Sequence, residues 1–329
     1  MKLFDCTLRD GANVLGKGFP ADLTEMMLQG LIENGITAIE YGNAGGIGAY
    51  EVSNSIAPLT DLEYLDLVQP YLGKAEIGMF LNAKRYREQN VVLAAEKGLA
   101  FLRVGADAGD SAIAMDAVRI VAHHGMKVCY SLMKAYIVSP AALAEESKKL
   151  EEAGVNEITI MDSAGFMTPD QASRYTEALV NAVGIPVGFH GHNNLGLSVA
   201  NVLAAIGSGA ELIDCGLLGM ARSAGNTPTE VIAAVLQRNG KLPEVNLFGL
   251  LRFLDERLIP AMEQYGYHTA IPPLDLILGY SGCHSGFLKI FRDIAREKKV
   301  DLHRLIVEVT RKNQKSPSEE QIRAVADAL

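Results

Sequence analysis

Eight short apolar runs alternate with longer amphipathic segments along the chain, and this alternation constrains the fold more than any other feature. The runs are rich in β-branched residues, which favour strands. They predict strands at Lys2–Cys6, Ala38–Gly42, Ala75–Leu81, Phe101–Gly105, Lys127–Leu132, Glu157–Asp162, Val187–His190 and Leu212–Cys215. Eight strand–helix units within roughly 240 residues match a closed parallel barrel better than an open doubly wound sheet.

The segments between these strands carry apolar residues at three- and four-residue spacing, which is typical of amphipathic helices. They predict helices at Asp22–Asn34, Arg87–Lys97, Ala112–His124, Pro140–Ala153, Pro169–Val183 and Ala200–Ser208. Gly35, Gly98, Gly125, Gly154 and Gly209 each follow such a segment. A helix commonly ends on a left-handed residue, which glycine tolerates, so the glycines support these boundaries.

The alternation stops after the segment Ala233–Gln237. Only helical segments follow, at Leu247–Gln264, Leu274–Lys298, Leu302–Lys312 and Glu319–Leu329. The link Asn239–Asn246 is polar and contains Pro243, as expected of a domain boundary. We therefore predict a (β/α)8 TIM-barrel catalytic domain in residues 1–240 and a small helical C-terminal domain in residues 241–329.

The overall charge restricts the partners. The chain has 329 residues and a formal net charge of −9, with no run rich in lysine or arginine. Nucleic acids and anionic membranes bind clustered positive charge. We therefore expect a small-molecule substrate, with neither nucleic acid nor membrane as a partner.

Other features of the sequence predict where in the cell the protein is found. The first predicted strand begins next to Met1, which leaves no room for a signal peptide, and no apolar run approaches the roughly 20 residues of a membrane-spanning helix. Cys6, Cys129, Cys215 and Cys283 form no CxxC pair, and three of them lie in apolar stretches. We expect buried thiols in a reducing compartment and a cytoplasmic protein.

Barrel enzymes carry their chemistry at the carboxyl ends of the strands, where the seventh predicted strand reads GFHGHNN. His190 and His192 are two residues apart, so both side chains project to the same side. Two neutral imidazoles a few ångströms apart suit a divalent metal. Such a pair also occurs for structural reasons, and the residues alone leave both interpretations open.

The segment DCTLRDG follows the first predicted strand, which a closed barrel separates from the seventh by one strand. Asp10 can therefore complete a His/His/carboxylate face with open positions for substrate. Arg9 would stabilise an oxygen that gains charge during reaction, such as an enolate. Asp5 and Glu40 are expected to orient Arg9 or a ligand imidazole. The alternative is a purely structural salt bridge from Arg9 to Glu40 or Asp5.

Five motifs occur in a telling order: DCTLRDG, the glutamate of AIEYG, DSAG, HGHNN and AGNTPTE. This order strongly resembles the DRE-TIM metallolyase superfamily. The stretch that begins HGHNNLGLSVANVL and ends AGNTPTEVIAAVL looks most like the 4-hydroxy-2-oxovalerate aldolases, as does the segment LILGYSGCHSGFL. The likeness spans nearly the whole chain and implies a pyruvate aldolase on this barrel fold.

The resemblance also implies the site. A divalent cation, typically Mn²⁺ with Mg²⁺, Co²⁺ or Zn²⁺ as alternatives, would bind Asp10, His190 and His192. The 2-oxo acid would bind that cation through its carbonyl and carboxylate oxygens. Arg9 would stabilise the pyruvate enolate, and Ser163 would help to hold the substrate carboxylate.

Other positions separate this chain from neighbouring families. Asn226 matches a loop that supplies a further metal ligand in some relatives, and Asp162 is expected to be structural or to orient a metal ligand. Biotin-dependent carboxyltransferases have a carbamylated lysine where this chain has Met161, and a thioether cannot replace it on a hard cation. Isopropylmalate and homocitrate synthases carry a glutamate, and hydroxymethylglutaryl-CoA lyases a reactive cysteine, in the loop that here contains Met220–Arg222. The resemblance therefore favours the aldolases.

One departure changes the expected mechanism. The 4-hydroxy-2-oxovalerate aldolases place a catalytic histidine after the Arg-Asp-Gly turn and a tyrosine opposite it, whereas this chain has Asn13 and His284. An amide cannot usefully accept a proton near pH 7, but an imidazole can. Our hypothesis is that the base has moved to His284, with a helix-packing histidine as the alternative. Lys134 and Lys17 are further acid–base candidates.

The main functional hypothesis is a divalent-metal-dependent aldolase, a lyase that cleaves or forms a 4-hydroxy-2-oxo acid through a metal-bound pyruvate enolate. The alternatives are a Claisen-type acyltransferase joining an acyl-CoA to a 2-oxo acid, and a metal or 2-oxo acid binding protein without turnover. A non-haem iron oxygenase also uses such a metal face, but fits the barrel and Arg9 less well. The expected partners are a small 2-oxo acid and an aldehyde, and a homodimer and a docked aldehyde dehydrogenase are left open.

Overall fold

The computed structural model describes residues 1–52, 55–271, 273–281, 283, 285–313 and 316–329. Within these ranges the chain forms two compact units, Met1–Ile232 and Ala233–Leu329. The division falls inside helix α9 (Thr229–Arg238). A domain boundary at residue 240 stays a prediction.

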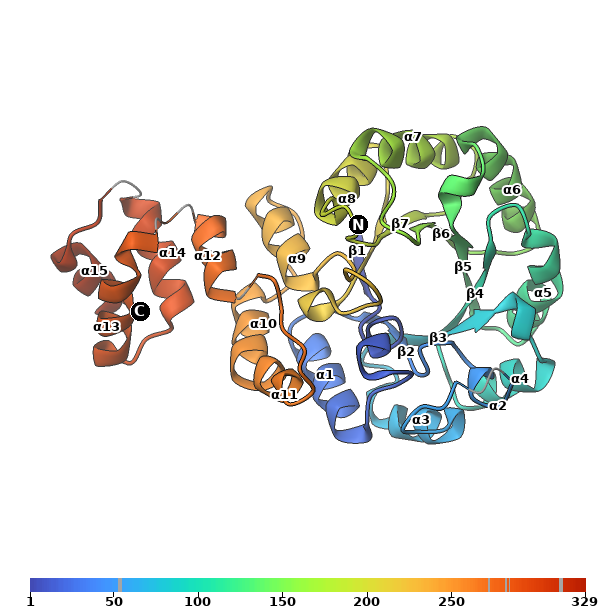
Figure 1. Ribbon diagram of the computed structural model, residues 1–329, viewed down its shortest axis with the longest axis horizontal. Coiled ribbons are helices and arrows are strands. Elements are labelled where there is room, and N and C mark those ends of the chain that lie inside the picture. The colour runs from blue at the N-terminus through green and yellow to red at the C-terminus, as the bar shows by residue number, and fades with distance from the viewer. Residues whose placement is uncertain (53–54, 272, 282, 284, 314–315) are drawn as a thin grey trace. The chain divides into compact units, whose positions relative to one another are not determined.

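Eight parallel strands in the order of the sequence close into a barrel (Figure 1). The closure is made by β1 and β8, which pair from Lys2 opposite Leu212 to Asp5 opposite Cys215. The predicted TIM barrel is therefore confirmed. The strands are β1 (Lys2–Asp5), β2 (Ala38–Tyr41), β3 (Glu76–Asn82), β4 (Phe101–Asp107), β5 (Lys127–Met133), β6 (Glu157–Asp162), β7 (Val187–Gly191) and β8 (Leu212–Cys215).

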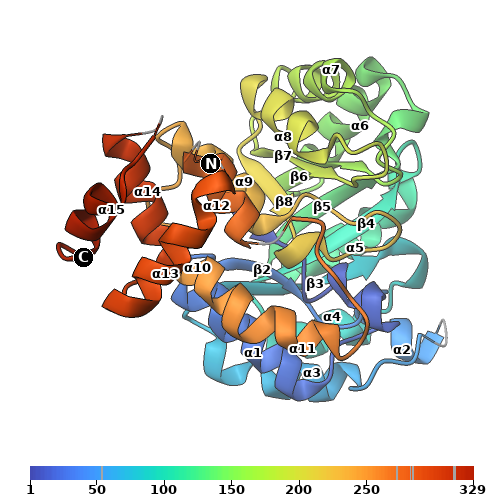
Figure 2. The ribbon, with the colours of Figure 1, turned by 60° about the vertical axis from the view of Figure 1, so that its left-hand side comes forward.

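Helices surround the strands on the outside, as Figures 1 and 2 show for α4 to α8. All five glycines expected to end helices have positive φ angles, between 74° and 107°. Two helices were not anticipated, of which α3 begins with a capping box between Thr60 and Glu63. The helices of the barrel are α1 (Ala21–Glu33), α2 (Ala49–Val52), α3 (Asp61–Leu67), α4 (Glu88–Glu96), α5 (Met115–His123), α6 (Pro140–Glu152), α7 (Pro169–Val180), α8 (Ser198–Gly207) and α9.

The barrel interior combines apolar packing with buried charges, of which Arg103 packs against an aromatic ring. Phe4 and Phe101 pack with tilted rings whose centroids are 5.3 Å apart, and the guanidinium of Arg103 lies 4.4 Å from the Phe4 ring. Cys6 and Cys129 belong to the same buried cluster. All four cysteines are buried free thiols, which agrees with the expectation from their apolar surroundings.

The C-terminal unit is helical, but two of its predicted helices are interrupted. The segment Leu247–Gln264 contains a π-helical turn at Leu254–Leu258 before Pro260, which cannot donate a backbone hydrogen bond. The segment Leu274–Lys298 is divided into two helices, with a short 3-10 helix at Ser285–Phe287 between them. Gly286 lies in that short helix, and a glycine costs a helix about 1 kcal/mol. The helices are α10 (Leu247–Phe253), α11 (Ile259–Glu263), α12 (Pro273–Ser281), α13 (Leu288–Lys298), α14 (Leu302–Lys312) and α15 (Glu319–Ala326).

Among the described residues, no helix has the length and hydropathy needed to cross a bilayer.

Candidate metal centre and active site

A cavity of about 560 Å³ opens at the carboxyl ends of the barrel strands. Its lining includes Asp10, His190 and His192, which the sequence predicts as metal ligands, together with Arg9 and Ser163. The closed barrel brings these residues together although they are up to 183 positions apart in the chain, from Arg9 to His192. The cavity is therefore the candidate site.

Asp10, His190 and His192 converge at this cavity. The Nε2 atoms of His190 and His192 lie 3.6 and 3.7 Å from Oδ2 of Asp10, and ligand atoms of all three lie within 4.8 Å of one another. Ligands about 2.1 Å from one ion at octahedral angles are roughly 3 Å apart. The spacing and the N,N,O donor chemistry fit one divalent cation.

The protonation states of these residues also suit a cation. Burial, together with the neighbouring His190, lowers the pKa of His192 to about 4, so its imidazole is neutral at pH 7. Burial alone would raise the pKa of Asp10, but Arg9 and the two imidazoles hold it below its usual range. A metal ion requires an ionised carboxylate and a neutral imidazole, which this arrangement supplies.

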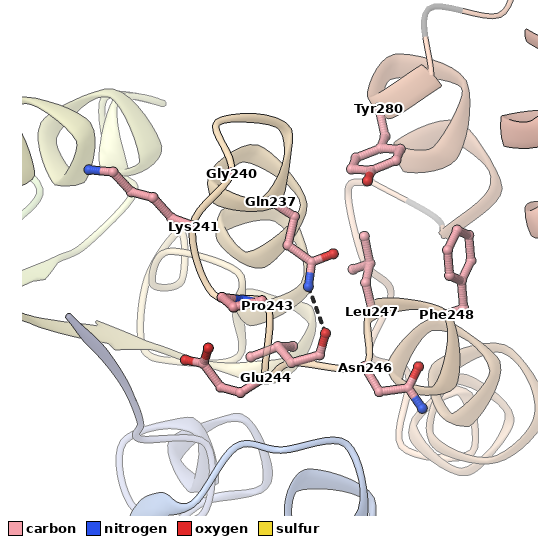
Figure 3. A pocket seen from close by; sticks show the side chains of 10 residues that line it. Gln237, Gly240, Lys241, Pro243, Glu244, Asn246, Leu247, Phe248 and Tyr280 are labelled. Atoms are coloured by element: carbon pink, nitrogen blue, oxygen red, sulfur yellow. Dashed lines mark hydrogen bonds between the residues drawn. The ribbon is translucent and has the colours of Figure 1, made fainter. Parts of the chain in front are cut away.

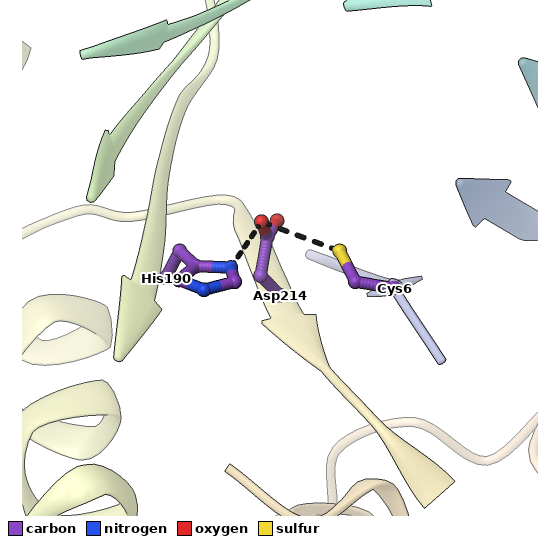
Figure 4. Close-up of side chains that lie close together, drawn as sticks. All are labelled: Cys6, His190 and Asp214. Atoms are coloured by element: carbon purple, nitrogen blue, oxygen red, sulfur yellow. Dashed lines mark hydrogen bonds and ion pairs between the residues drawn. The ribbon is translucent and has the colours of Figure 1, made fainter. Parts of the chain in front are cut away.

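Asp214, at the end of β8, orients His190 from inside the barrel (Figure 4). Its Oδ2 lies 2.9 Å from Nδ1 of His190, which leaves Nε2 for a metal. Arg103 donates to both carboxylate oxygens, at 2.7 and 2.9 Å. Although burial opposes ionisation, Arg103 and His190 lower the pKa of Asp214 to about 2. A carboxylate behind a histidine ligand fixes the ring and raises its basicity.

Cys6 lies beside the same carboxylate, as Figure 4 shows, and forms with His190 and Asp214 a second group of possible metal ligands. Its Sγ is 3.5 Å from Oδ2 of Asp214 and 3.7 Å from Nη1 of Arg103. Burial, reinforced by the charge of Asp214, raises the pKa of the thiol well above its usual value. Arg103 and His190 already occupy both oxygens of Asp214, so the Asp10, His190 and His192 group at the cavity is the better candidate for a metal.

Arg9 is held by two carboxylates. Its Nε donates to Oε2 of Glu40 at 2.6 Å and its Nη1 donates to Oδ1 of Asp10 at 3.0 Å. Its guanidinium also lies 5.0 Å from the centre of the Phe80 ring. No described residue accepts a hydrogen bond from Nη2, which is not sealed from the cavity. Glu40 thus orients Arg9 as expected, and one donor of Arg9 is left for a ligand.

Asn226 borders the donor set from the loop after β8. Its Nδ2 donates to Oδ2 of Asp10 at 2.9 Å, and it pairs with His192 in an isolated antiparallel bridge. Its buried Oδ1 has no hydrogen-bond partner within the described ranges. Asn226 therefore positions Asp10 and offers a neutral oxygen beside it.

The expected role of Asp5 is wrong. In the described part of the chain its carboxylate accepts from the backbone N–H of Thr7 and the hydroxyl of Thr229, at 2.9 and 2.8 Å, and not from Arg9 or an imidazole. Asp5 is the last residue of β1, and its carboxylate bonds to Thr229 of α9 rather than to Arg9. Asp162 accepts the backbone N–H groups of Phe166 and Met167, a structural role that matches its prediction.

Ser163 and Lys134 both line the cavity. The Ser163 hydroxyl oxygen accepts from the backbone N–H of Lys134 at 2.9 Å, which leaves its own proton available to a ligand. The Lys134 ammonium pairs with Asp107 at 3.1 Å. Lys17 is not among the described residues that line the cavity.

Asn13 is engaged on both sides of its amide. Its Nδ2 donates to the backbone oxygen of Asp10 at 2.9 Å, and its Oδ1 accepts from Nε of Arg222 at 2.7 Å. Asn13 therefore links the loop after β1 to the loop after β8. His284, the predicted general base, lies outside the described residues.

Sequence reasoning assigned no role to four residues at or below the cavity. Asp214 ends a strand, the same signal that points to the other site residues, and Arg103 is a lone charge in the apolar run FLRVG. Both signals were sufficient to find them. Arg85 and Arg222 lie in loops that line the cavity, and nothing in their local sequence marks them.

A second cavity of about 510 Å³ lies within the C-terminal unit and is bordered by residues 237–248 and Tyr280 (Figure 3). Nε2 of Gln237 closes one side by donating to the backbone oxygen of Val245 at 2.6 Å. Both groups of possible metal ligands found in the described residues lie in the barrel. The chemistry therefore belongs to the barrel cavity.

The chain is similar to known enzymes over its full length. The HMGL-like family model matches residues 1–255. The 4-hydroxy-2-oxovalerate aldolase of Carboxydothermus hydrogenoformans is 32% identical over 329 residues, which cover 100% of this chain and 97% of that protein. The 4-hydroxy-2-oxovalerate aldolase of Thermomicrobium roseum is 32% identical over 326 residues, which cover 99% and 90%.

This chain belongs to the HMGL-like, or DRE-TIM, family. It is an aldolase-type lyase, as the resemblance of its motifs predicts. The family implies a divalent metal, and the donor set of Asp10, His190 and His192 fits one.

Two solved structures share the fold. The carboxyl transferase domain of Rhizobium etli pyruvate carboxylase superposes with a TM-score of 0.69 at 18% identity, covering 100% of this chain and 60% of that one. The HMG-CoA lyase of Bacillus subtilis superposes with a TM-score of 0.66 at 17% identity, covering 82% and 95%. At this identity the likeness shows the barrel fold alone.

Proposed function

We propose that this chain is a Mn²⁺-dependent aldolase that cleaves a 4-hydroxy-2-oxo acid into pyruvate and an aldehyde, or joins the two in reverse. Full-length relatives that carry the name 4-hydroxy-2-oxovalerate aldolase support this substrate class. The observation that carries the proposal is the accessible Nη2 of Arg9 beside the Asp10, His190 and His192 donor set. A fixed cation there matches an oxygen that gains negative charge.

The metal would be held by Asp10, His190 and His192, with Asp214 fixing the ring of His190. When bound, it supplies Lewis-acid polarisation of the 2-oxo carbonyl. The N,N,O donor set with room for further oxygen ligands suits Mn²⁺. The unpartnered Oδ1 of Asn226 offers one such oxygen.

The residues of the chain would then divide the cleavage step among them. A base removes the proton of the 4-hydroxyl, the C3–C4 bond breaks, and its electron pair passes to the C2 carbonyl oxygen. The products are pyruvate enolate and a free aldehyde, and protonation of C3 gives pyruvate. Arg9 would donate from Nη2 to the enolate oxygen, while Ser163 would donate its hydroxyl proton to the substrate carboxylate.

We assign the general base to His284. The amide of Asn13, which stands where relatives carry a histidine, is committed to Asp10 and Arg222 on its two sides. His284→Ala should lower kcat on the order of 10²–10⁴-fold, the usual contribution of a positioned acid–base group. Wild-type activity should rise through pH of about 6.5, where histidine ordinarily titrates, and Asn13→His should restore part of the loss. Full activity in His284→Ala would direct the search to Lys134 or Lys17.

The direct test is incubation of the Mn²⁺-loaded protein with a panel of 4-hydroxy-2-oxo acids, with pyruvate measured by a coupled reduction. We expect pyruvate release that stops after chelation and returns with Mn²⁺. A parallel reaction offers an acyl-CoA and a 2-oxo acid and measures free CoA. Free CoA without pyruvate release would favour the acyltransferase, and neither product with metal bound would favour a binding protein.

The aldehyde dehydrogenase partner, the homodimer and the cytoplasmic location stay predictions that rest on the family resemblance and on sequence reasoning.

A further inference from the structure

Most of the positive charges near the cavity are neutralised by carboxylates. Arg9 pairs with Glu40 and Asp10, Lys134 pairs with Asp107, and Arg103 below the cavity pairs with Asp214. Such pairing is expected, because a buried or half-buried charge without a counter-ion is costly. The exceptions are therefore informative.

Arg85 and Arg222 line the same cavity, and neither forms an ion pair with any described carboxylate. The half-buried Arg85 is held by a neutral oxygen, since its Nη2 donates to the backbone carbonyl of Gly45 at 2.5 Å. Arg222 is an exposed residue, and its Nε donates to another neutral oxygen, the amide Oδ1 of Asn13, at 2.7 Å. Each guanidinium is therefore held at the cavity by a neutral oxygen, and neither has a carboxylate partner among the described residues.

The two arginines also repel each other. Burial lowers the pKa of Arg85, and the charge of Arg222 lowers it further. Nη1 of Arg85 and both Nη atoms of Arg222 donate to no residue that the structure describes. In a protein of net charge −9, two mutually repelling cations with free donors at one cavity fit an anion that arrives from outside.

Arg85 and Arg222 lie in the segments that follow β3 and β8. The residues proposed to bind the pyruvate half come from other strands, since Ser163 follows β6 and Arg9 follows β1. The pyruvate half of the substrate already has partners in Arg9 and Ser163. A cavity of about 560 Å³ lies within the range of roughly 300–1,000 Å³ that holds drug-sized ligands, so it has room for a longer tail.

We propose that Arg85 and Arg222 form an anion subsite that binds a carboxylate or phosphate on the aldehyde half of the substrate. The substrates are then 4-hydroxy-2-oxo acids with a second anionic group at the far end. This inference rests on the proposed aldolase function and narrows its substrate class. Arg85 and Arg222 bind the tail and do not touch the reacting atoms.

The test compares two 4-hydroxy-2-oxo acids of equal length, one ending in a carboxylate and one in its neutral amide. Hydrogen bonds to charged groups correspond to roughly 10–100-fold in kcat/KM, so the wild type should prefer the acid by that factor. In Arg85→Met/Arg222→Gln the preference should fall to within a few-fold, through KM rather than kcat, because tail binding is equal in the ground and transition states. Lys84→Met removes a positive charge from the same loop and should keep the preference.

A second measurement does not require turnover. Calorimetry with the Mn²⁺-loaded protein compares a 2-oxo dicarboxylic acid, its uncharged ω-amide, an ω-phosphorylated 2-oxo acid and an acyl-CoA. We expect the diacid or the phosphorylated acid to bind at least about tenfold more tightly than the amide, with the difference lost in Arg85→Met/Arg222→Gln. Whichever of the two binds more tightly identifies the anion.

The outcomes separate the two proposals. If no pyruvate is released but calorimetry keeps the arginine-dependent preference, the aldolase function fails and the anion subsite stands. If acid and amide bind and react equally, or the preference survives in the double variant, the anion subsite is refuted while the aldolase function stands. Arginine-dependent binding of the acyl-CoA alone would also refute it, in favour of a CoA phosphate.

Discussion

The two ends of the barrel both carry charged residues and use them in opposite ways. At the amino ends of the strands, Lys2 pairs with Glu76 and Lys127 pairs with Glu157, each at 2.5 Å. At the carboxyl ends, the Asp10 carboxylate lies 3.6 and 3.7 Å from two imidazole nitrogens, and all three side chains line the cavity. Charges that cancel one another stabilise a fold, whereas charges arranged around a space are available to bind.

The carboxyl end of the barrel itself contains both kinds of charge, those that pair with each other and those that do not. Arg103 and Asp214 form a closed ion pair below the cavity, which positions His190. Arg85 and Arg222 have no carboxylate among the described residues. The depth of a charge therefore separates the two pairs: the deep pair fixes the ring of His190, and the outer pair has no counter-ion among the described residues.

The largest expected effect comes from Arg9→Lys, which keeps the charge but loses the planar fork shared with Glu40 and Asp10. We expect kcat/KM at saturating Mn²⁺ to fall by at least about 10²-fold, the scale of removing one oxyanion donor. Arg119→Lys, on the exposed face of α5, is the matched control. An Arg9→Lys enzyme within a few-fold of wild type would place Arg9 among the structural charges.

The next effect concerns the deep pair. Asp214→Asn removes the negative charge behind His190, and we expect Mn²⁺ affinity to fall by roughly 10–100-fold. The variant also leaves Arg103 without its partner and should be less stable. Arg103→Met/Asp214→Asn should recover part of the stability but not the affinity. Recovery of both in the double variant would show that Asp214 acts only as a counter-ion.

The sequence predicts a site residue where that residue follows the end of a predicted strand. The barrel and the Asp10, His190 and His192 face were predictable, because the alternation sets the strand order and each residue follows a strand end. The partners of Arg103 were not, since contact between β4 and β8 depends on the register of the closed barrel.

Other errors have equally local causes. Asp5 was expected to orient Arg9, but a strand-end side chain has two directions, and its carboxylate accepts hydrogen bonds from Thr7 and Thr229 instead. The segment Leu274–Lys298 was predicted as one helix because its apolar periodicity hid the cost of Gly286, which lies in the short 3-10 helix Ser285–Phe287.

A smaller effect should appear at Glu230, a wholly buried carboxyl that accepts from the backbone N–H of Leu218 at 3.0 Å. Burial raises its pKa from 4.5 to about 7. The folded state therefore holds a proton that the unfolded state releases between these values, so this group reduces stability as pH rises from 4.5 to about 7.

Glu230→Gln keeps the size and the acceptor of this side chain without the charge. We compare the free energy of unfolding of this variant with that of the wild type. The difference, variant minus wild type, should be about 1–3 kcal/mol larger at pH of about 8 than at pH of about 4.5. Urea unfolding at both pH values measures this difference, and the exposed Glu244→Gln is the control. An equal difference at the two pH values would contradict the raised pKa.

The smallest expected effect on stability comes from an ion pair at the amino ends of the barrel strands. Lys2 and Glu76 are 34% and 49% exposed, and ion pairs as accessible as this contribute about 0–1 kcal/mol. We expect Lys2→Met to change the free energy of unfolding within that range and to leave kcat/KM unchanged. A tenfold fall in kcat/KM would show that the two ends are not separate in function.

The central claim is that Asp10, His190 and His192, at the carboxyl ends of the barrel strands, hold a divalent metal ion. Its most direct test is the Mn²⁺ content of the purified chain after loading and desalting, compared with that of His190→Ala/His192→Ala. We expect about one ion per chain in the wild type, little in the variant, and a circular dichroism spectrum that is the same for both, since strand-end residues contribute little to the core. Equal Mn²⁺ content in the two proteins would contradict the account.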